Sequence, residues 1–298
     1  MVAESRSSTP LFVASCLEDR VWCLDGDSGM ILAKIPVGHE PRSVALNSDK
    51  SLLYVSNSGD GSVSVVSTRE LRVVDTFAVG PDPRGLAVSP EGRWLWVLSR
   101  QGSRLCVLEA LSGRPVHEVA VGRGPRNLTL APERNLLFIT NNADDTVSAV
   151  ELDSLRVQRT FPVRGQPYGV LYCDGLLYVT SIRDHVVSIH DPGSGREVGC
   201  ILVGRHPTSI APSPDGRCLY VTNLDDDALS RVDRHARQRL ESLRVGKSPF
   251  AATLSADGQR LFVSCNGDHS VWVMESSTGR KLSVVQVGRD PHGLAVAD

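Results

Sequence analysis

A unit of about 42 residues repeats along the whole chain, and this period restricts the possible fold more than any other feature. Each unit ends in Val-Gly or a close variant, and a proline follows two or three residues later. The glycines are Gly38, Gly80, Gly122, Gly165, Gly204, Gly246 and Gly288, and the prolines are Pro41, Pro83, Pro125, Pro167, Pro207, Pro249 and Pro291. A fixed period in this range is typical of propellers and solenoids.

Each unit contains four short segments with the pattern of β-strands. In the second unit these are residues 43–46, 52–56, 62–67 and 72–79, which are rich in alternating or β-branched apolar residues. Turns rich in Asp, Ser, Pro and Gly separate them. Seven units of four strands predict an all-β fold, a seven-bladed β-propeller with four antiparallel strands per blade.

The two ends of the chain predict how the ring closes. The first unit starts at its second strand, residues 11–15, and the chain finishes with a first strand at 291–296. We therefore expect the C-terminal strand to complete the N-terminal blade in a three-plus-one closure, which removes the open edge. In the expected single domain of residues 1–298, the blades are about 10–38 plus 291–297, 41–80, 83–122, 125–165, 167–204, 207–246 and 249–288.

A short motif recurs in the second strand of the units. It reads Tyr54-Val55-Ser56-Asn57 in the second unit and Tyr220-Val221-Thr222-Asn223 in the sixth, with related versions at 138–141, 178–181 and 262–265 and weaker ones at 12–15 and 96–99. These segments resemble the YVTN family of propeller repeats, whereas the Gly-His and Trp-Asp pairs of WD40 repeats do not recur. The resemblance implies the fold but not the function, because such propellers include surface modules, binding proteins and enzymes.

Charge and hydropathy exclude several classes of partner. The chain has 32 Lys and Arg against 34 Asp and Glu, a net charge of −2, so it lacks the positive field that nucleic acids and anionic lipids attract. It has no apolar run long enough to span a bilayer, and residues 1–10 do not have the pattern of a signal peptide. We expect a soluble, cytoplasmic, monomeric protein that binds neither nucleic acid nor membrane.

The residue after each repeat proline is expected to open the innermost strand beside the propeller axis. These seven residues, called the axial residues below, are Arg42, Arg84, Arg126, Tyr168, Thr208, Phe250 and His292. Because guanidinium groups suit carboxylate or phosphate, the three arginines predict an anion clamp, with an aromatic wall of Tyr168, Phe250 and His292 on the opposite arc. The alternative is that the arginines pair with carboxylates of neighbouring blades as structural ties.

Histidines and acids also occur in the loops expected on the face that carries the funnel. They are His39, Glu40, His206, Asp290 and His292 between blades, and His185 and His269 between second and third strands. Imidazole and carboxylate groups perform acid-base chemistry near neutral pH and bind divalent metals. Candidate catalytic residues are therefore His292, Asp290 and His206, candidate ligand-binding residues include His185 and His269, and candidate ligands of a divalent metal are His39, His206 and His292. No spacing such as H-E-x-x-H supports a metal site, so the cofactor stays open.

An acidic residue recurs in the loops that join second to third strands. The residues are Glu18, Asp60, Asp144, Asp184, Asp226 and Asp268, with Gly102 as the exception. An acid that recurs so regularly at one position of the repeat predicts a structural role, in which the carboxylate stabilises the turn by accepting hydrogen bonds from backbone amides.

The segment Asp290-Pro291-His292-Gly293 resembles the Glu-Pro-His-Gly element of the virginiamycin B lyase family, seven-bladed propellers that use a metal in eliminative ring opening. This resemblance implies a functional role for His292, with Asp290 at the position of the family's Glu. Where that family has a second Pro-His, this sequence has Pro249-Phe250. Because a phenyl ring supplies neither ligand nor base, the match indicates the location of a site and not the family's reaction.

Two functions fit these observations. The first is a small-molecule-binding propeller whose funnel takes an anionic or oxygen-rich ligand, with lyase, isomerase or lactone or ester hydrolase activity as the chemistry that acid-base groups and an anion clamp support. The second is a non-catalytic scaffold that binds a protein partner. The variation among the axial residues favours the first, because a scaffold needs no individual side chains at its axis.

Overall fold

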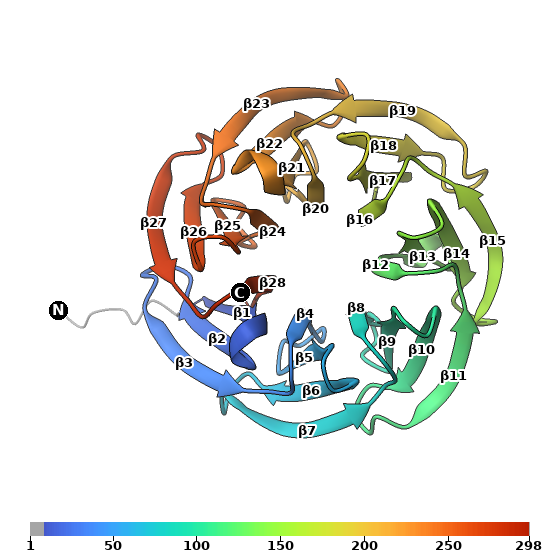
Figure 1. Ribbon diagram of the computed structural model, residues 1–298, viewed down its shortest axis with the longest axis horizontal. Helices are drawn as coiled ribbons and strands as arrows, with labels where there is room; N and C mark the ends of the chain where they lie inside the picture. Colours follow the sequence, from blue (N-terminus) through green and yellow to red (C-terminus); the bar gives the residue numbers. More distant parts are fainter. Residues whose placement is uncertain (1–8, 298) are drawn as a thin grey trace.

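The computed structural model describes residues 9–297, which form seven four-stranded antiparallel sheets arranged in a ring around a central axis (Figure 1). The predicted seven-bladed β-propeller is therefore confirmed. In each sheet one strand lies beside the axis and the fourth lies on the outer rim. Residues 9–297 contain no helix that is long and apolar enough to cross a membrane.

The strands are listed here by blade, from the axis outward. Blade 1 has β28 (Pro291–Val296), β1 (Pro10–Ser15), β2 (Arg20–Asp25) and β3 (Ile31–Pro36), and blade 2 has β4 (Pro41–Leu46), β5 (Leu52–Asn57), β6 (Ser62–Ser67) and β7 (Arg72–Ala78). Blade 3 has β8 (Pro83–Val88), β9 (Trp94–Ser99), β10 (Arg104–Glu109) and β11 (Pro115–Ala120), and blade 4 has β12 (Pro125–Ala131), β13 (Leu136–Asn141), β14 (Thr146–Glu151) and β15 (Arg156–Pro162). Blade 5 has β16 (Pro167–Cys173), β17 (Leu176–Ser181), β18 (Val186–His190) and β19 (Glu197–Leu202), and blade 6 has β20 (Pro207–Pro212), β21 (Cys218–Asn223), β22 (Ala228–Asp233) and β23 (Gln238–Arg244). Blade 7 has β24 (Pro249–Leu254), β25 (Arg260–Cys265), β26 (Ser270–Glu275) and β27 (Lys281–Gln286).

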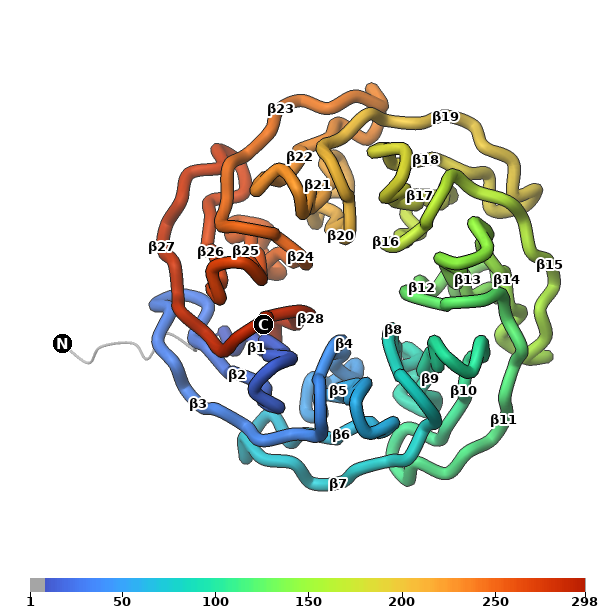
Figure 2. Tube along the Cα trace, in the orientation of Figure 1, coloured from blue at the N-terminus to red at the C-terminus, as the bar shows by residue number. Residues whose placement is uncertain are grey.

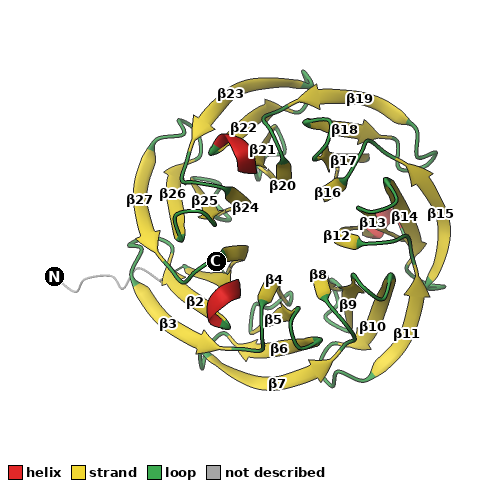
Figure 3. Cartoon of the chain, viewed as in Figure 1, coloured by secondary structure: helices red, strands yellow, loops and turns green. Residues whose placement is uncertain are grey.

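Three short 3₁₀ helices are the helical elements of the described residues: η1 (Cys16–Glu18), η2 (Pro132–Arg134) and η3 (Leu224–Asp226) (Figure 3). Two of them, η1 and η3, replace the loop between the second and third strands of their blades. Each of these two ends on an aspartate in the left-handed region, Asp19 with φ 54° and Asp227 with φ 51°. Aspartate tolerates this conformation better than most side chains, so it can end the helix and start the next strand.

The ring closes through the pairing of β28 with β1. The two strands are antiparallel, with Leu11 opposite Val296 and Val13 opposite Leu294. The first and last strands of the chain, β1 and β28, therefore lie side by side in blade 1 (Figure 2). This arrangement confirms the predicted three-plus-one closure.

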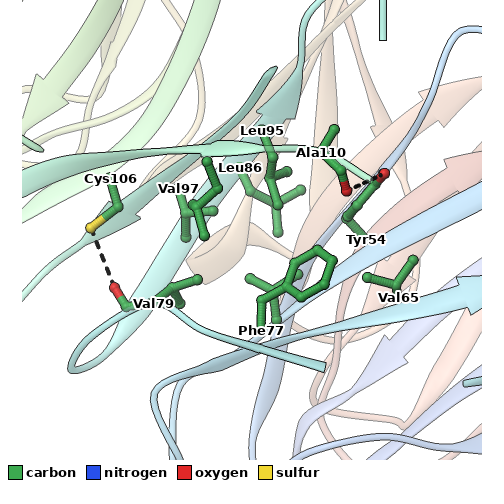
Figure 4. Packing of buried hydrophobic residues seen from close by; sticks show 11 residues of the cluster. Tyr54, Val65, Phe77, Val79, Leu86, Leu95, Val97, Cys106 and Ala110 are labelled. Carbon is green, nitrogen blue, oxygen red and sulfur yellow. Dashed lines mark hydrogen bonds between the residues drawn. The ribbon is translucent and has the colours of Figure 1, made fainter. Parts of the chain in front are cut away.

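The hydrophobic core is divided into clusters that lie between adjacent blades. Figure 4 shows the cluster between blades 2 and 3, where Tyr54 and Phe77 of blade 2 pack against Leu95 and Val97 of blade 3. The Tyr54 hydroxyl donates to the Ala110 carbonyl across this boundary at 3.0 Å. Since the tyrosine that opens the recurring motif is fully buried and bonded to the next blade, it fixes the angle between neighbours.

The innermost strands approach one another closely around the axis. A Cβ atom on Gly169 of β16 would lie 2.6 Å from the Thr208 carbonyl oxygen of β20. At Gly293 of β28 it would lie 2.9 Å from the Arg42 carbonyl oxygen of β4. A side chain does not fit at either position, so these glycines permit the close approach that brings the axial residues together.

Candidate functional site

The axial residues follow an irregularity at the start of every innermost strand. In all seven blades the pairing between the innermost and second strands shifts register directly after the repeat proline. Such bulges change the direction of the side chain that follows. The position that varies in the sequence is therefore the position that the fold turns toward the axis.

The hydroxyl residue of the recurring motif holds the axial residues in place. Thr140 Oγ1 donates to the Tyr168 carbonyl at 2.8 Å, and Ser264 Oγ donates to the His292 carbonyl at 2.7 Å. Both hydroxyl residues are fully buried. Because each bond joins one blade to the next, the axial side chains project from a backbone that is fixed on both sides.

A pocket of about 190 Å³ lies on the axis and is lined by the axial residues. Its walls include Arg42, Arg84, Arg126, Tyr168, Thr208, Phe250 and His292, together with small or apolar residues that follow them on the innermost strands. At about 30 Å³ for a water molecule in the liquid, this volume corresponds to roughly six waters. It suits a small ligand, not a nucleotide or a peptide.

Two of the three arginines are paired with acids two residues earlier in the chain. Arg84 Nε lies 2.7 Å from Asp82, whose carboxylate also pairs with Arg100 at 3.1 Å. Arg42 lies 3.4 Å from Glu40. For Arg42 and Arg84, the expected structural ties are therefore present, but the acids come mainly from the loop that enters the same blade.

Arg126 has no such acid. Gly124 occupies the position at which Glu40 and Asp82 stand in the two preceding blades, and no carboxylate of residues 9–297 lies within ion-pair distance of Arg126. Its Nε is buried without a hydrogen-bond partner. Burial lowers the pKa of the guanidinium and the charges of Arg100 and Arg84 lower it further, while Tyr168 and Asp82 act in the opposite direction, and a guanidinium stays protonated at neutral pH. The pocket wall thus contains a cation that forms no direct ion pair with an acid of residues 9–297.

The other half of the pocket wall is aromatic. The rings of Tyr168 and Phe250 meet edge to face, with centroids 5.8 Å apart, and Phe250 lies 4.2 Å from the His292 ring. Thr208 stands between Tyr168 and Phe250 in the order of blades, and its small side chain leaves room for this contact. Arg126 lies 5.3 Å from the Tyr168 ring centroid, so the cationic and aromatic halves are in contact.

His292 joins the two halves on the other side. Its side chain is buried, with Nε2 2.8 Å from Arg42 Nη1 and 3.1 Å from Asp290 Oδ2. Burial lowers the pKa of His292, and Arg42 and Arg84 lower it further despite the opposing effect of Asp290, so the ring is neutral at neutral pH. Since a guanidinium can only donate, Nε2 accepts from Arg42 and the ring proton is assigned to Nδ1.

One group of three metal-ligating side chains lies beside the pocket. Within residues 9–297, Cys16, Asp290 and His292 alone bring three such ligand atoms within 4.8 Å of one another. Burial raises the pKa of the Cys16 thiol to about 12, so the sulfur is protonated. The Arg42 guanidinium already stands at the His292 nitrogen. A protonated thiol and an adjacent fixed cation do not fit a divalent metal.

Two of the histidines considered as metal ligands lie on the rim and not in the pocket. His39 Nδ1 lies 3.0 Å from Asp19, and the His39 side chain is 62% exposed. His206 Nδ1 lies 3.3 Å from Asp225. The expectation that His39 and His206 join His292 in one metal site is therefore corrected, because each is held by a carboxylate at a blade boundary of its own. The position of His206 likewise separates it from the candidate catalytic pair of His292 and Asp290.

His185 and His269 do not line the pocket either. Their Nδ1 atoms accept hydrogen bonds from the backbone amides of His206 and Asp290, at 3.3 and 3.4 Å. The equivalent side chain in blade 6, Asp227, accepts from the amide of Ser248 at 2.8 Å. These histidines therefore replace an acid that ties each blade to the loop entering the next one, and this structural contact explains their place in the repeat.

Five of the six loop acids, all except Glu18, bond backbone amides as expected. Oxygens of Asp60, Asp144, Asp184, Asp226 and Asp268 accept from the amides of His39, Arg123, Gly165, Arg205 and Lys247, at 2.6 to 3.3 Å. These amides belong to the loop that enters the same blade. These acids thus fix the loops in front of the axial residues.

Sequence reasoning missed four residues that shape the site: Asp82, Arg100, Gly124 and Cys16. For Asp82 and Gly124 a signal was present, because the residue before each repeat proline reads Glu, Asp and Gly in the three arginine-bearing blades. Arg100 and Cys16 stand directly after the recurring motif, where the side chain varies without a recognisable pattern. Their proximity to the pocket depends on packing across blades.

Comparisons with known proteins support the fold. No protein-family model matches the chain, and no curated protein matches it in sequence. A chain of Kuenenia stuttgartiensis hydrazine synthase is similar in structure, with a TM-score of 0.83 and 18% identity over 90% of this chain and 92% of that one. A functionally unknown protein from Desulfotomaculum acetoxidans has a TM-score of 0.84 and 16% identity over 98% of this chain and 99% of the other.

A third similar structure is that of the dihydro-heme d1 dehydrogenase NirN in complex with DHE. It has a TM-score of 0.77 and 18% identity, over 99% of this chain and 76% of that one. At such identities the likeness shows the β-propeller fold alone. The narrower resemblances to YVTN repeats and to the virginiamycin B lyase family stay predictions.

Proposed function

We propose that the axial pocket binds a small organic or inorganic monoanion and that Arg126 is its main ligand-binding residue. The observation that carries this proposal is the half-buried guanidinium of Arg126, whose Nε is buried without a hydrogen-bond partner and which has no carboxylate of residues 9–297 within ion-pair distance. Leaving a partly buried charged group unpaired is unfavourable unless a ligand or water compensates it. An anion with two oxygens on one centre matches the forked donors of arginine.

The charged groups that line the pocket or pair with its arginines and His292 support a ligand with a single negative charge. Four guanidinium groups, of Arg42, Arg84, Arg100 and Arg126, stand against three carboxylates, of Glu40, Asp82 and Asp290, so one formal positive charge remains with His292 neutral. A monoanion balances this charge. A dianion would leave an excess negative charge in a partly buried site.

A catalytic role for His292 is a further part of the proposal. Its Nδ1 has no hydrogen-bond partner among the described residues, and the ring lines the pocket. A neutral imidazole at this place can exchange a proton with a bound ligand, while Arg42, which is itself 3.8 Å from Asp290, donates to its other nitrogen. Lyase, isomerase and ester or lactone hydrolase activities remain the reaction classes consistent with such a group, and Asp290 acts in this proposal as a positioning residue.

A scaffold without a ligand is the competing proposal. It accounts for Arg42 and Arg84, which are paired within the protein, but it gives no reason for an unpaired cation at the axis. Arg126 therefore favours ligand binding over a scaffold role.

Isothermal titration calorimetry with formate, acetate, benzoate and phosphate tests anion binding. We expect at least one monoanion to bind the wild type and the Arg126→Gln variant to lose at least tenfold in affinity. Arg205→Gln is the matched control, because Arg205 is exposed and already paired with Asp226. If no probe binds the wild type, or if both variants bind equally well, the anion site is wrong and the scaffold is favoured.

A further inference from the structure

We infer that the ligand of the axial pocket is a monocarboxylate attached to a flat aromatic or unsaturated body. This inference rests on the proposed anion binding and names the chemical class of the ligand. It follows from the distribution of the axial residues, the contact between Arg126 and Tyr168, and the size of the pocket.

The pocket wall has two chemically different arcs. Arginines come from three successive innermost strands, β4, β8 and β12, whereas the rings come from β16, β24 and β28 (Figure 1). A ligand that was charged on all sides, such as phosphate or sulfate, would use only the first arc. A ligand that fills both arcs needs a charged end and an apolar body.

The two arcs meet at Arg126 and Tyr168. With the guanidinium carbon 5.3 Å from the Tyr168 ring centroid, a carboxylate bound to Arg126 places the atoms attached to it beside that ring. The guanidinium plane accepts two carboxylate oxygens in parallel hydrogen bonds, which fixes the direction of the ligand as well as its end. The ligand body is therefore directed along the aromatic arc.

The aromatic arc has few free hydrogen-bonding groups. The Thr208 hydroxyl already donates to the Phe250 carbonyl at 2.7 Å, so the Tyr168 hydroxyl and His292 Nδ1 are the polar groups left among the carbon surface of Tyr168, Phe250 and His292. Aromatic rings prefer such offset or perpendicular contacts with one another, so a ligand ring can join this arc through the same kind of contact. A body rich in hydroxyl groups, such as a sugar acid, would lose its hydrogen bonds to water along this arc.

The pocket volume sets the size of the group that the pocket can enclose. A volume of about 190 Å³ accommodates a single six-membered ring with its carboxylate but does not enclose a tetrapyrrole or a nucleotide, whose sites are typically several hundred Å³. Benzoate is therefore a suitable probe of the class.

The test compares the affinities of four probes by calorimetry: benzoate, cyclohexanecarboxylate, acetate and phosphate. We expect benzoate to bind at least tenfold more tightly than acetate and several-fold more tightly than cyclohexanecarboxylate, because ring pairs contribute about 0.5–1.5 kcal/mol beyond their buried area, or about 2- to 10-fold each. Phosphate should bind most weakly. If acetate or phosphate binds as well as benzoate, the aromatic class is wrong while the anion site stands, and if none of the probes binds, both fail.

Variants separate the contribution of the rings from that of the charge. Tyr168→Leu is expected to lower the preference for benzoate over acetate by about 2- to 10-fold with little change for acetate itself, whereas Tyr168→Phe should retain the preference. Arg126→Gln should lower the affinity for both benzoate and acetate. Equal preference for benzoate in Tyr168→Leu and wild type would overturn the inference. The melting temperatures of the ligand-free variants show whether each one folds, and Phe250→Leu provides a second test if Tyr168→Leu does not.

Discussion

At the scale of single residues, the distinctive feature is a missing acid. The residue before each repeat proline has positive φ throughout the ring, with values of 53° at Glu40, 52° at Asp82, 65° at Gly124 and 58° at Asp290. Acids are therefore tolerated at this position: Glu40 and Asp82 each pair an axial arginine, and Asp290 lies beside the axial His292. The unpaired state of Arg126 results from a single glycine and not from a difference in backbone.

This comparison predicts that Gly124→Asp abolishes anion binding, because the new carboxylate would pair with Arg126 as Asp82 pairs with Arg84. A Cβ at Gly124 would lie 3.1 Å from the Ala143 Cβ, so a small shift of the neighbour accommodates it. The measurement is the affinity of benzoate or acetate by calorimetry. Gly124→Asn is the matched control, because it has the same shape and no charge and should reduce affinity much less. Equal losses in both variants would show that steric change, not charge, is responsible.

For single residues, the sequence identified which side chains lie at the axis, but not which of them are paired with an acid. Their place follows from counting one residue past each repeat proline, so the repeat alone predicts which side chains meet. Whether an arginine is paired depends on rotamers and on side chains such as Arg100, which come from another strand. His185 and His269 were expected to bind the ligand, but each accepts a hydrogen bond from a backbone amide instead. Their ring nitrogens thus have the role that a carboxylate oxygen has in other blades.

At the scale of elements, β28 has two roles, since it closes the ring and presents His292 to the pocket. Its pairing with β1 buries Leu11 and Val13 on one side of the boundary, together with the partly buried Leu294 and Val296. Removing it exposes a strand edge and part of the core cluster between blades 7 and 1.

Deleting residues 290–298 should therefore lower the melting temperature by roughly 10 °C or more, at about 2–4 °C per kcal/mol of lost stability. Scanning calorimetry or circular dichroism measures this change. The double variant Asp290→Asn, His292→Gln is the control, because it removes the side chains of the site and keeps the strand, and it should melt much closer to the wild type. An unchanged melting temperature after the deletion would contradict the closure.

At the scale of the whole molecule, the repeat explains why fold and site were predictable to different degrees. Positions that serve every blade in the same way, such as the loop acids Asp60, Asp144 and Asp226, recur and can be recognised in one sequence. The axial residues differ from blade to blade because the motif hydroxyls and loop acids already fix the backbone around them. Their identity is therefore free to suit a ligand, and it carries information about function that no repeat pattern contains.

The ring also determines the direction of the ligand. Since its axial residues come from seven different blades, the arginine arc and the aromatic arc face each other across the axis, and no local segment of the chain contains both. The central claim is that one carboxylate occupies this space with Arg126 as its partner.

A crystal structure of the protein soaked with 4-bromobenzoate tests this claim most directly, because the anomalous signal of bromine locates the ligand independently of its density. We predict a carboxylate within about 2.7–2.9 Å of the Arg126 guanidinium nitrogens, the charge-assisted hydrogen-bond distance, with the ring against Tyr168 and Phe250. Bromine peaks away from the axis, together with a pocket that contains ordered water alone beside Arg126, would contradict it.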